Sequence, residues 1–473
     1  MAGRTVLGCA DARPPCQLRP PPRRLPRPRA SATTPAPDDA SAAAARAGAV
    51  PLFVGNDAAA APAPLAAGGL RSWQELVSNP ELHLQRAWSA EDAHVLRRKG
   101  HLKEQDALIE FVIALCRTHT APEAFAKVEG WVAEHRQRSR GSTLSRLVPS
   151  MGEFFTPLPL AAALADYDLF SGLSRRRYVA PNFAEVRHVL NMAQVRASAG
   201  SLRLITFDAD GTLYDDGAHF EQDNAMIRKI IALLTQGLHV GVVTAAGYPG
   251  EAWRFEGRLK GLLSAFRSLP LSDEAAARFH VMGGECNYLL RLDADCRLQF
   301  IQPDQWQLPE MRGWSDQEVA ALLDGAERAL LEETQRLRMP VQLVRKPRAC
   351  GVVPTGRVIY EQLEEVALAV QVSLAGAALP FCAFNGGNDV FVDVGNKSLG
   401  LQALQQYVGA QPAQVLHVGD RFTITGNDNQ VRGCCSILWV ANPDETAFFM
   451  GLLLDAIGLA RKDRGADEGW LYE

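Results

Sequence analysis

The sequence predicts an α/β protein built around a parallel sheet. In the later part of the chain, short apolar runs with strand character alternate with segments of helical periodicity. A strand at 202–207 is followed by a helix at 222–236 and a second strand at 238–243. Two further strands are expected at 415–418 and 436–440. Strands that alternate with helices in this way pair in parallel through crossover helices.

The chain is too long for one compact core, because 473 residues normally divide into two or three domains. Before the sheet, helical spacing predominates, for example between Gln105 and Cys116. A long insertion interrupts the sheet, and within it Ser315 and Glu318 form a capping box that opens a helix. We therefore expect an extension at 1–70, a mainly helical regulatory or oligomerisation domain at 71–198, a core at 199–249 and 377–473, and an inserted cap at 250–376.

Composition excludes several classes of protein. The hydrophobic content of 47% and charged content of 22% are those of an ordinary globular protein, and the net charge of −4 argues against a nucleic-acid-binding surface. No apolar run approaches the roughly 20 residues that span a bilayer. The nine cysteines are scattered without metal-ligand spacing, which is typical of a reducing compartment. We expect a soluble intracellular protein without nucleic-acid or membrane partners.

The first 70 residues differ from the rest, since they are rich in Pro, Ala and Arg and contain few acids. Such a segment buries too little apolar surface to order itself. It is either an organellar transit peptide, which is typically rich in Arg and poor in acids, or a disordered extension. The protein is accordingly expected in the cytoplasm, or in a plastid or another organelle if the extension is a transit peptide.

The most informative segment is the end of the first strand, where Asp208 and Asp210 precede Gly211 and Thr212. Two carboxylates at the end of a buried strand are costly to hold ionised unless a cation or a reaction uses them. The pattern predicts phosphoryl transfer with Mg²⁺, in which Asp208 attacks phosphorus and Asp210 protonates the leaving oxygen and later activates water. An acid-rich turn that ends a strand is the structural alternative.

Two residues with phosphate-binding chemistry follow. Thr244 ends the second strand, where its hydroxyl group and nearby N–H groups can hold a phosphate oxygen. Lys397 begins a helix, where its ammonium group can meet both the phosphate and Asp208. The structural alternatives are that Thr244 simply ends a strand and that Lys397 is an exposed helix residue.

A later strand ends at Asp420, and Asp428 follows eight residues on. These carboxylates would complete an oxygen-only Mg²⁺ shell with Asp208 and the carbonyl oxygen of Asp210. Asp420 alone could be a helix N-cap. Polar residues at successive strand ends, the edge at which open α/β sheets bind ligands, favour a common site.

These motifs resemble the four motifs of the haloacid dehalogenase (HAD) superfamily of phosphatases. The resemblance implies a HAD-like Rossmannoid sheet, and the insertion at 250–376 is similar to the superfamily's cap domains. One departure is the gap between Asp420 and Asp428, which is longer than usual and leaves open which acid contacts the metal. Asp420 is favoured.

A narrower resemblance is to the IMP-specific 5′-nucleotidase family. It is carried by residues 206–217 (TFDADGTLYDDG), 384–397 (FNGGNDVFVDVGNK) and 419–422 (GDRF). Shorter motifs in the helical region, at 97–102, 149–155 and 187–191, also match. The resemblance therefore covers nearly everything after about residue 70.

That resemblance implies Mg²⁺-dependent hydrolysis of IMP to inosine and phosphate in purine nucleotide catabolism, stimulation by ATP, and a homotetramer. Asp216 and Asp389 would help to hold the substrate together with Asp210, Thr244 and Lys397. His188 would belong to the ATP effector site, although a lone helical histidine is more often a packing residue.

Two other functions stay open. One is a phosphatase of the same fold that acts on other nucleotides or sugar phosphates, because base choice depends on cap contacts that spacing does not reveal. The other is a non-catalytic nucleotide sensor, against which the intact motif residues argue. The basic segment at 345–351 either meets the substrate phosphate as the cap closes or is a solvated turn.

Overall fold

The structure is a computed structural model that describes residues 102–269 and 271–469. The predicted extension at 1–70 and most of the motif at 97–102 lie outside the described residues. Among the helices that the structure describes, none combines the length and the apolar character needed to cross a membrane.

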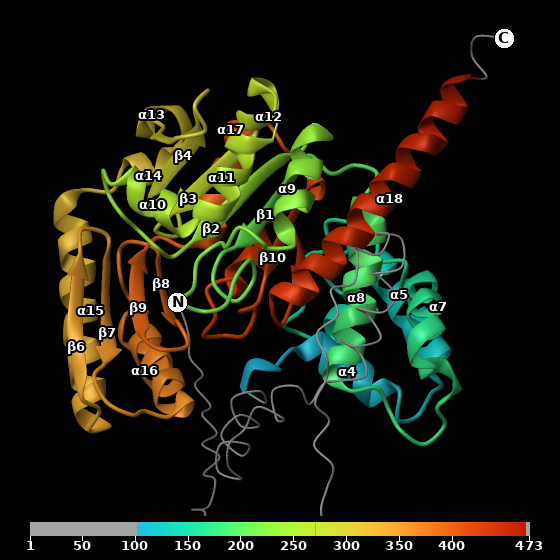
Figure 1. The fold of residues 1–473 in the computed structure, drawn as a ribbon. Coiled ribbons are helices and arrows are strands. Elements are labelled where there is room, and N and C mark those ends of the chain that lie inside the picture. The colour runs from blue at the N-terminus through green and yellow to red at the C-terminus, as the bar shows by residue number, and fades with distance from the viewer. Residues whose placement is uncertain (1–101, 270, 470–473) are drawn as a thin grey trace, which may run out of the picture. The chain divides into compact units, whose positions relative to one another are not determined.

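A seven-stranded sheet forms the centre of the fold, with the strand order β11-β10-β1-β2-β3-β4-β5 (Figure 1). Five neighbouring strands are parallel, and two antiparallel strands complete one edge. The strands are β1 (Leu204–Asp208), β2 (His239–Thr244), β3 (Phe279–Gly283), β4 (Tyr288–Leu292), β5 (Leu298–Phe300), β10 (Val415–Gly419) and β11 (Ser436–Trp439). The four strands predicted from the sequence are thus confirmed as β1, β2, β10 and β11.

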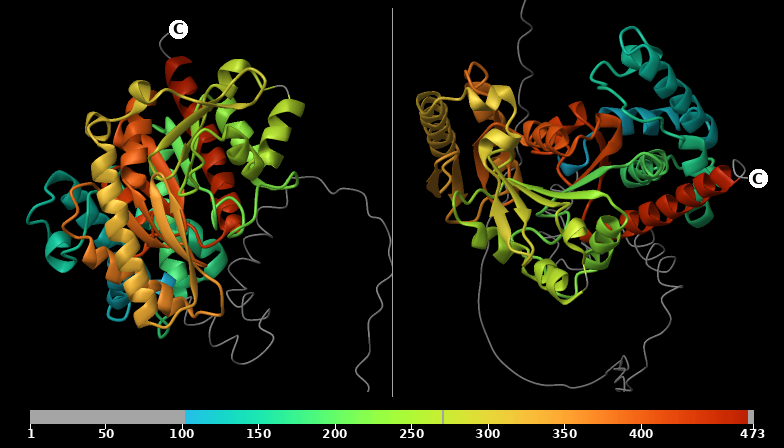
Figure 2. Two further views of the ribbon diagram at one scale, coloured as in Figure 1. Left: turned by 90° about the vertical axis from the view of Figure 1, so that its left-hand side faces the viewer. Right: turned by 90° about the horizontal axis from the view of Figure 1, so that it is seen from above.

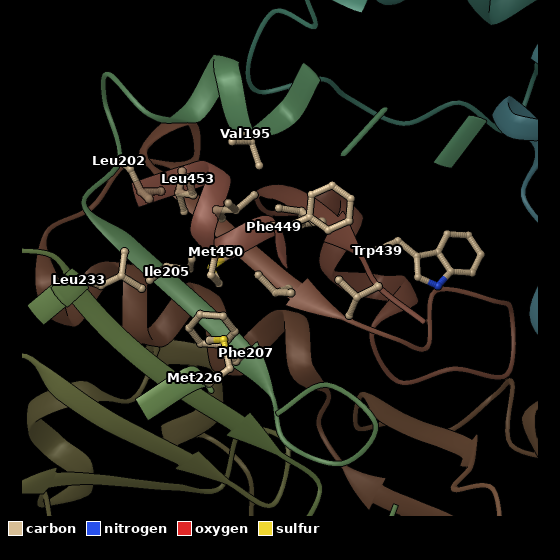
Figure 3. Packing of buried hydrophobic residues seen from close by; sticks show 14 of the residues in the cluster. Val195, Leu202, Ile205, Phe207, Met226, Leu233, Trp439, Phe449, Met450 and Leu453 are labelled. Atoms are coloured by element: carbon tan, nitrogen blue, oxygen red, sulfur yellow. The ribbon is translucent and has the colours of Figure 1, made fainter. Parts of the chain in front are cut away.

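The central strands β1 and β10 are buried along their whole length because helices cover both faces of the sheet. On one face, Leu401 and Leu404 of α17 (Lys397–Val408) pack with Leu204 and Val243. On the other face, Ile205 and the other inward side chains meet α9 (Met226–Thr235), α8 (Phe183–Ser198) and α18 (Pro443–Gly469). Figure 3 shows this second contact, where Phe207 of β1 lies with Met226 of α9 and Met450 of α18.

Between residue 102 and β1, the described residues are mostly helical, whereas residues 71–101 of the predicted helical domain lie outside the described residues. Helix α8 of this region packs against α18 and the edge strand β11. A buried ion pair fixes this contact, with Arg187 Nη1 of α8 lying 2.6 Å from Glu445 Oε2 of α18. The preceding helices are α4 (Ala107–Leu115), α5 (Ala121–Gln137), α6 (Thr143–Leu147), α7 (Leu160–Ser171) and the short η1 (Leu173–Arg175).

A second, four-stranded antiparallel sheet has the order β6-β7-β9-β8. Its strands are β6 (Val341–Lys346), β7 (Ala349–Pro354), β8 (Phe381–Asn385) and β9 (Val390–Val394). The helices α15 (Asp316–Arg336) and α16 (Tyr360–Ser373) cover one face of this sheet, as Figures 1 and 2 show. The capping box that opens α15 at Ser315 and Glu318 is confirmed. The insertion therefore contributes a separate α+β layer with its own core.

The strands divide this region differently from the predicted cap at 250–376. Strands β3, β4 and β5 lie inside that range but extend the central sheet, and β8 and β9, expected in the core, belong to the second sheet. Strand membership depends on a distant partner, such as Phe279 opposite Val240 or Val392 opposite Cys350, and local composition does not reveal it. The remaining short helices are α10 (Ala252–Arg258), α11 (Lys260–Ser268), α12 (Asp273–Ala276), α13 (Pro303–Trp306), α14 (Pro309–Arg312), η2 (Pro412–Gln414) and η3 (Asn429–Gly433).

We predict that the stability of the fold falls in mild acid partly because of His280 on β3. Burial lowers the pKa of this imidazole to about 3, so below its ordinary pKa the unfolded chain takes up a proton that the folded chain does not. One such group costs about 1.4 kcal/mol between pH 7.5 and pH 5.5. The decrease in the free energy of unfolding between these two pH values should therefore be smaller by that amount in His280→Gln, as measured by urea unfolding at both pH values.

The matched control is His219→Gln, because His219 is about half exposed. Its replacement should leave the pH dependence of unfolding as it is in the native protein. An unchanged pH dependence in His280→Gln would show that the buried imidazole is protonated in the folded state.

Candidate active site

A cavity of about 280 Å³ lies between the carboxyl edge of the central sheet and the open face of the second sheet. The carboxyl ends of adjacent parallel strands meet at this edge, where α/β sheets bind ligands. Five of the predicted site residues line this cavity, which we call the cleft: Asp208, Asp210, Asp216, Thr244 and Asp389. The structure thus brings together residues that lie up to 181 positions apart in the chain.

Asp208 is the last residue of β1 and is almost fully buried at the base of the cleft. Its Oδ1 lies 2.7 Å from the Nζ of Lys397. Burial and the neighbouring carboxylates of Asp428 and Asp420 raise the pKa of Asp208 well above its ordinary value, although Lys397 opposes them. A further cation beside Asp208 would favour the ionised form, which is the nucleophilic one.

Lys397 is the first residue of α17 and is completely buried. The side chain of Asn396 caps this helix, and the Nζ of Lys397 lies between Asp208 and Asp428, 2.6 Å from Asp428 Oδ1. Burial alone would lower the pKa of Lys397, but these two carboxylates raise it above its ordinary value. The ammonium group is therefore charged and holds both acids in place.

Asp428 is held on both carboxylate oxygens. His417 Nε2 lies 3.0 Å from its Oδ1, and the backbone N–H of Arg421 donates to its Oδ2. Burial lowers the pKa of His417, so the ring is neutral; its partners assign the proton to Nε2, and Nδ1 accepts from the Thr206 hydroxyl group at 2.9 Å. A side chain at Gly419 would collide with the Asp428 carboxylate, which explains the glycine before Asp420.

Asp208, Asp420 and Asp428 present carboxylate oxygens that all lie within 4.8 Å of one another. Among the described residues, the Oδ1 of Asp420 has no hydrogen-bond partner, and its nearest cationic group is Arg421 Nε at 3.7 Å. A buried carboxylate oxygen without a donor is costly, and oxygen donors of this type suit a hard divalent cation. The residues therefore fit a metal ion, with Asp420 offering the available oxygen and Asp428 already engaged.

Asp210 turns away from this acidic cluster toward the cleft. Its Oδ1 accepts from the backbone N–H of Gly217 at 3.1 Å and from Arg258 Nη2 at 2.6 Å. The Arg258 guanidinium group also lies over the ring of Tyr214, 5.3 Å from its centroid. Gly211 permits the turn, because it has a φ of +75° and any Cβ there would collide with Asp420.

The remaining predicted substrate residues surround the cleft. The hydroxyl oxygen of Thr244 accepts from the backbone N–H of Ala246 at 3.1 Å. The carboxylate of Asp216 pairs with Arg421 Nη2 at 3.0 Å. Burial raises the pKa of Asp389, and the positive charge of Arg421 opposes this rise. Sequence reasoning missed Arg421, although it directly follows Asp420. Its side chain contacts both the Asp216 carboxylate and the backbone carbonyl oxygen of Asn385.

His188 lies away from the cleft, buried on α8. Its Nε2 is 3.0 Å from Glu445 Oε1, and burial lowers the pKa of the imidazole. A larger cavity of about 650 Å³ adjoins this region and is lined by α4, α8 and the loop after β10. The neighbours Arg187 and Asn191 line that cavity, whereas His188 lies behind them.

Comparison with known proteins identifies the family. The family model of the IMP-specific 5′-nucleotidases matches residues 96–450, which is most of the chain. The chain belongs to this family. It is therefore a phosphoric monoester hydrolase, and the predicted family and the HAD-like fold are both confirmed.

The chain is similar to curated relatives in fungi. It is 46% identical over 318 residues to IMP-specific 5′-nucleotidase 1 of Aspergillus fumigatus, a match that covers 64% of this chain and 70% of the relative. It is 40% identical over 414 residues to the Emericella nidulans protein of the same name, covering 76% of this chain and 91% of the relative.

Solved structures of Plasmodium falciparum IMP-nucleotidase are also similar. The IMP-bound, N-terminally truncated form is 33% identical, with a TM-score of 0.70, and the match covers 74% of this chain and 96% of that one. The ATP-bound form is 30% identical, with a TM-score of 0.69 and coverage of 83% and 94%.

We predict that the two acids after β10 differ in their effect on stability. Asp428→Asn removes one of the two carboxylates that pair with Lys397 and should destabilise the metal-free protein by about 3 kcal/mol, because it breaks a fully buried ion pair. Asp420→Asn should be neutral or stabilising, since the buried Oδ1 accepts no hydrogen bond from any described residue and the nearest cationic groups among these residues, Arg421 and Lys103, lie 3.7 Å and 3.9 Å from the carboxylate. Urea unfolding in the presence of a chelator measures both changes.

The same variants can be compared for divalent-cation binding by calorimetry. Asp420→Asn should weaken the binding of the divalent cation although it does not destabilise the metal-free protein. Equal destabilisation by the two substitutions would contradict the assignment of Asp428 as the structural acid.

Proposed function

We propose that this protein hydrolyses IMP to inosine and phosphate through a phosphorylated Asp208. The observation that carries the proposal is the pairing of Asp208 with a buried Lys397 at the base of the cleft, in a chain of the IMP-specific 5′-nucleotidase family. The similarity to a Plasmodium structure described as IMP-bound supports the choice of substrate.

In the first step, a carboxylate oxygen of Asp208 attacks phosphorus, and the bond from phosphorus to the 5′ oxygen of IMP breaks. Asp210 donates a proton to that oxygen, and inosine leaves. Arg258 orients Asp210 through its 2.6 Å contact with Oδ1. In the second step, Asp210 takes a proton from water as the water oxygen attacks phosphorus, which releases phosphate and restores the Asp208 carboxylate.

Asp208, Asp420 and the carbonyl oxygen of Asp210 are the ligands that we propose for Mg²⁺. The ion supplies positive charge to the phosphate oxygens when it is bound. Asp428 supports this site indirectly, because it fixes Lys397 and accepts from His417.

Thr244 would hold a phosphate oxygen. Lys397, which contacts Asp208, would attract the phosphate through its positive charge. Asp216 and Asp389 would accept hydrogen bonds from the ribose hydroxyl groups, since both line the same cleft. Arg421 would keep Asp216 in position through the contact between their side chains.

We further propose that ATP activates the enzyme through the helical region at 71–198, and that the protein is a homotetramer. A Plasmodium structure described as ATP-bound supports a nucleotide effector. His188 would belong to the effector site, and its contact with Glu445 would link that site to α18. The enzyme would act in purine nucleotide catabolism, in the cytoplasm or in an organelle to which residues 1–70 direct it.

The proposal predicts the substrate profile. Phosphate release should be fastest with IMP among IMP, AMP, GMP and ribose 5-phosphate, should require Mg²⁺, and should rise when ATP is added. Comparable rates on all four substrates would favour the broader phosphatase, and no release from any of them would favour the nucleotide sensor.

Asp208→Asn should abolish turnover while leaving the fold intact, because the amide is neither nucleophilic nor charged. Steady-state phosphate release measures the loss, and circular dichroism checks the fold. Asp215→Asn is the control, since Asp215 lies in the same loop but is exposed to solvent. More than a few per cent of residual activity in Asp208→Asn would mean that another group attacks phosphorus.

A further inference from the structure

The open face of the second sheet forms one wall of the cleft. Side chains alternate along a strand, and on β9 the residues Val390, Val392 and Val394 pack against α15 and α16. The two residues between them, Phe391 and Asp393, therefore face the cleft, which both of them line.

Phe391 lies flat on the sheet. A Cβ at Gly351, the residue opposite Phe391 on β7, would be only 2.5 Å from the phenyl ring. Phe384 of β8 stands opposite Phe391 on the other side and is nearly buried. The absence of a side chain at Gly351 thus allows a planar aromatic surface to form in the cleft wall.

A cation lies over this aromatic surface. The Nζ of Lys346, the last residue of β6, lies 5.0 Å from the centroid of the Phe391 ring. Its neighbour Arg345 projects to the opposite face, where it pairs with Asp324 and Glu327 of α15. Of the two adjacent basic residues, only Lys346 lines the cleft.

Lys346 belongs to the wall of the cleft that the second sheet forms, whereas Asp208 and Thr244, at the phosphate end, belong to the central sheet. Its positive charge helps to lower the pKa values of Asp389 and Asp393, which burial raises. The charged groups that act on Asp208 are instead Lys397 and two carboxylates. The ammonium group is therefore placed beside the position of the nucleoside.

We propose that the purine base of the substrate stacks on Phe391, and that Lys346 moves from its place over this ring to donate a hydrogen bond to the 6-oxo group of hypoxanthine. An ammonium group has three donors and no acceptor, so it pairs with the oxygen of IMP but leaves the 6-amino group of AMP unpaired. Such an unpaired contact in a desolvated site discriminates strongly between substrates. The inference rests on the proposed function, which assigns the phosphate to the Asp208 end.

The test is Lys346→Met, which keeps the length of the side chain and removes the donor. The value of kcat/KM should fall by about ten- to a hundred-fold for IMP and GMP together, because both carry the 6-oxo group. For ribose 5-phosphate it should stay within about two-fold, because this substrate offers no such acceptor, and for AMP it should stay the same or rise, because the unpaired contact is removed. Lys346→Gln should narrow the preference for IMP over AMP, since an amide can pair with either group.

Two further variants separate the roles. Arg345→Met, the control on the opposite face, should leave kcat/KM unchanged for all four substrates. Phe391→Leu should lower kcat/KM for all three nucleotides by about five- to a hundred-fold, as expected for a lost stacking partner, and should spare ribose 5-phosphate.

An equal loss on ribose 5-phosphate in Lys346→Met would overturn the inference, because it would place Lys346 on the phosphate. An unchanged preference for IMP over AMP would overturn it as well. A failure of the proposed function is visible separately, since the native protein would then show no preference for IMP.

Discussion

Lys397 is fully buried, and its ammonium group lies between the carboxylates of Asp208 and Asp428. Several features of the fold serve this contact. Strand β1 brings Asp208 to the edge of the sheet, and α17 begins at the same edge because Asn396 caps it there. Removing the Lys397 ammonium group would leave two buried carboxylates without this counter-charge, which is a costly arrangement in a protein interior.

The second sheet is joined directly to this contact. Strand β9 ends at Val394, and α17 begins three residues later with Lys397, so one short segment carries both the cleft wall and the catalytic ammonium group. The carbonyl oxygen of Val394 accepts from the side-chain amide of Asn287 at 2.8 Å, which ties this segment to the central sheet. The wall that faces the nucleoside is therefore held in a fixed position relative to the site of phosphoryl transfer.

The sequence predicted the parts that local patterns encode. Apolar strands, the carboxylates at the end of β1 and the capping residues at 315 and 318 follow from neighbouring residues alone. The partition of strands between the two sheets did not follow, since pairing partners lie far apart in the chain.

The same limit applies within the site. The contact of His417 with Asp428 and the contact of Arg258 with Asp210 are made across 11 and 48 residues, and nothing in the local sequence signals them. His188, chosen from a resemblance, lies in a buried ion-pair cluster whose partner Glu445 is 257 residues away. Tertiary structure was needed to see that this histidine lies behind a cavity and outside the cleft.

The central claim is that Asp208 forms a covalent bond to phosphorus before water does. The most direct test is the stereochemical course of hydrolysis, followed with an IMP analogue whose phosphorothioate group is made chiral by isotopic labelling. Two successive in-line displacements predict that the released thiophosphate retains its configuration. Inversion would mean a single attack by water, and would contradict the role assigned to Asp208.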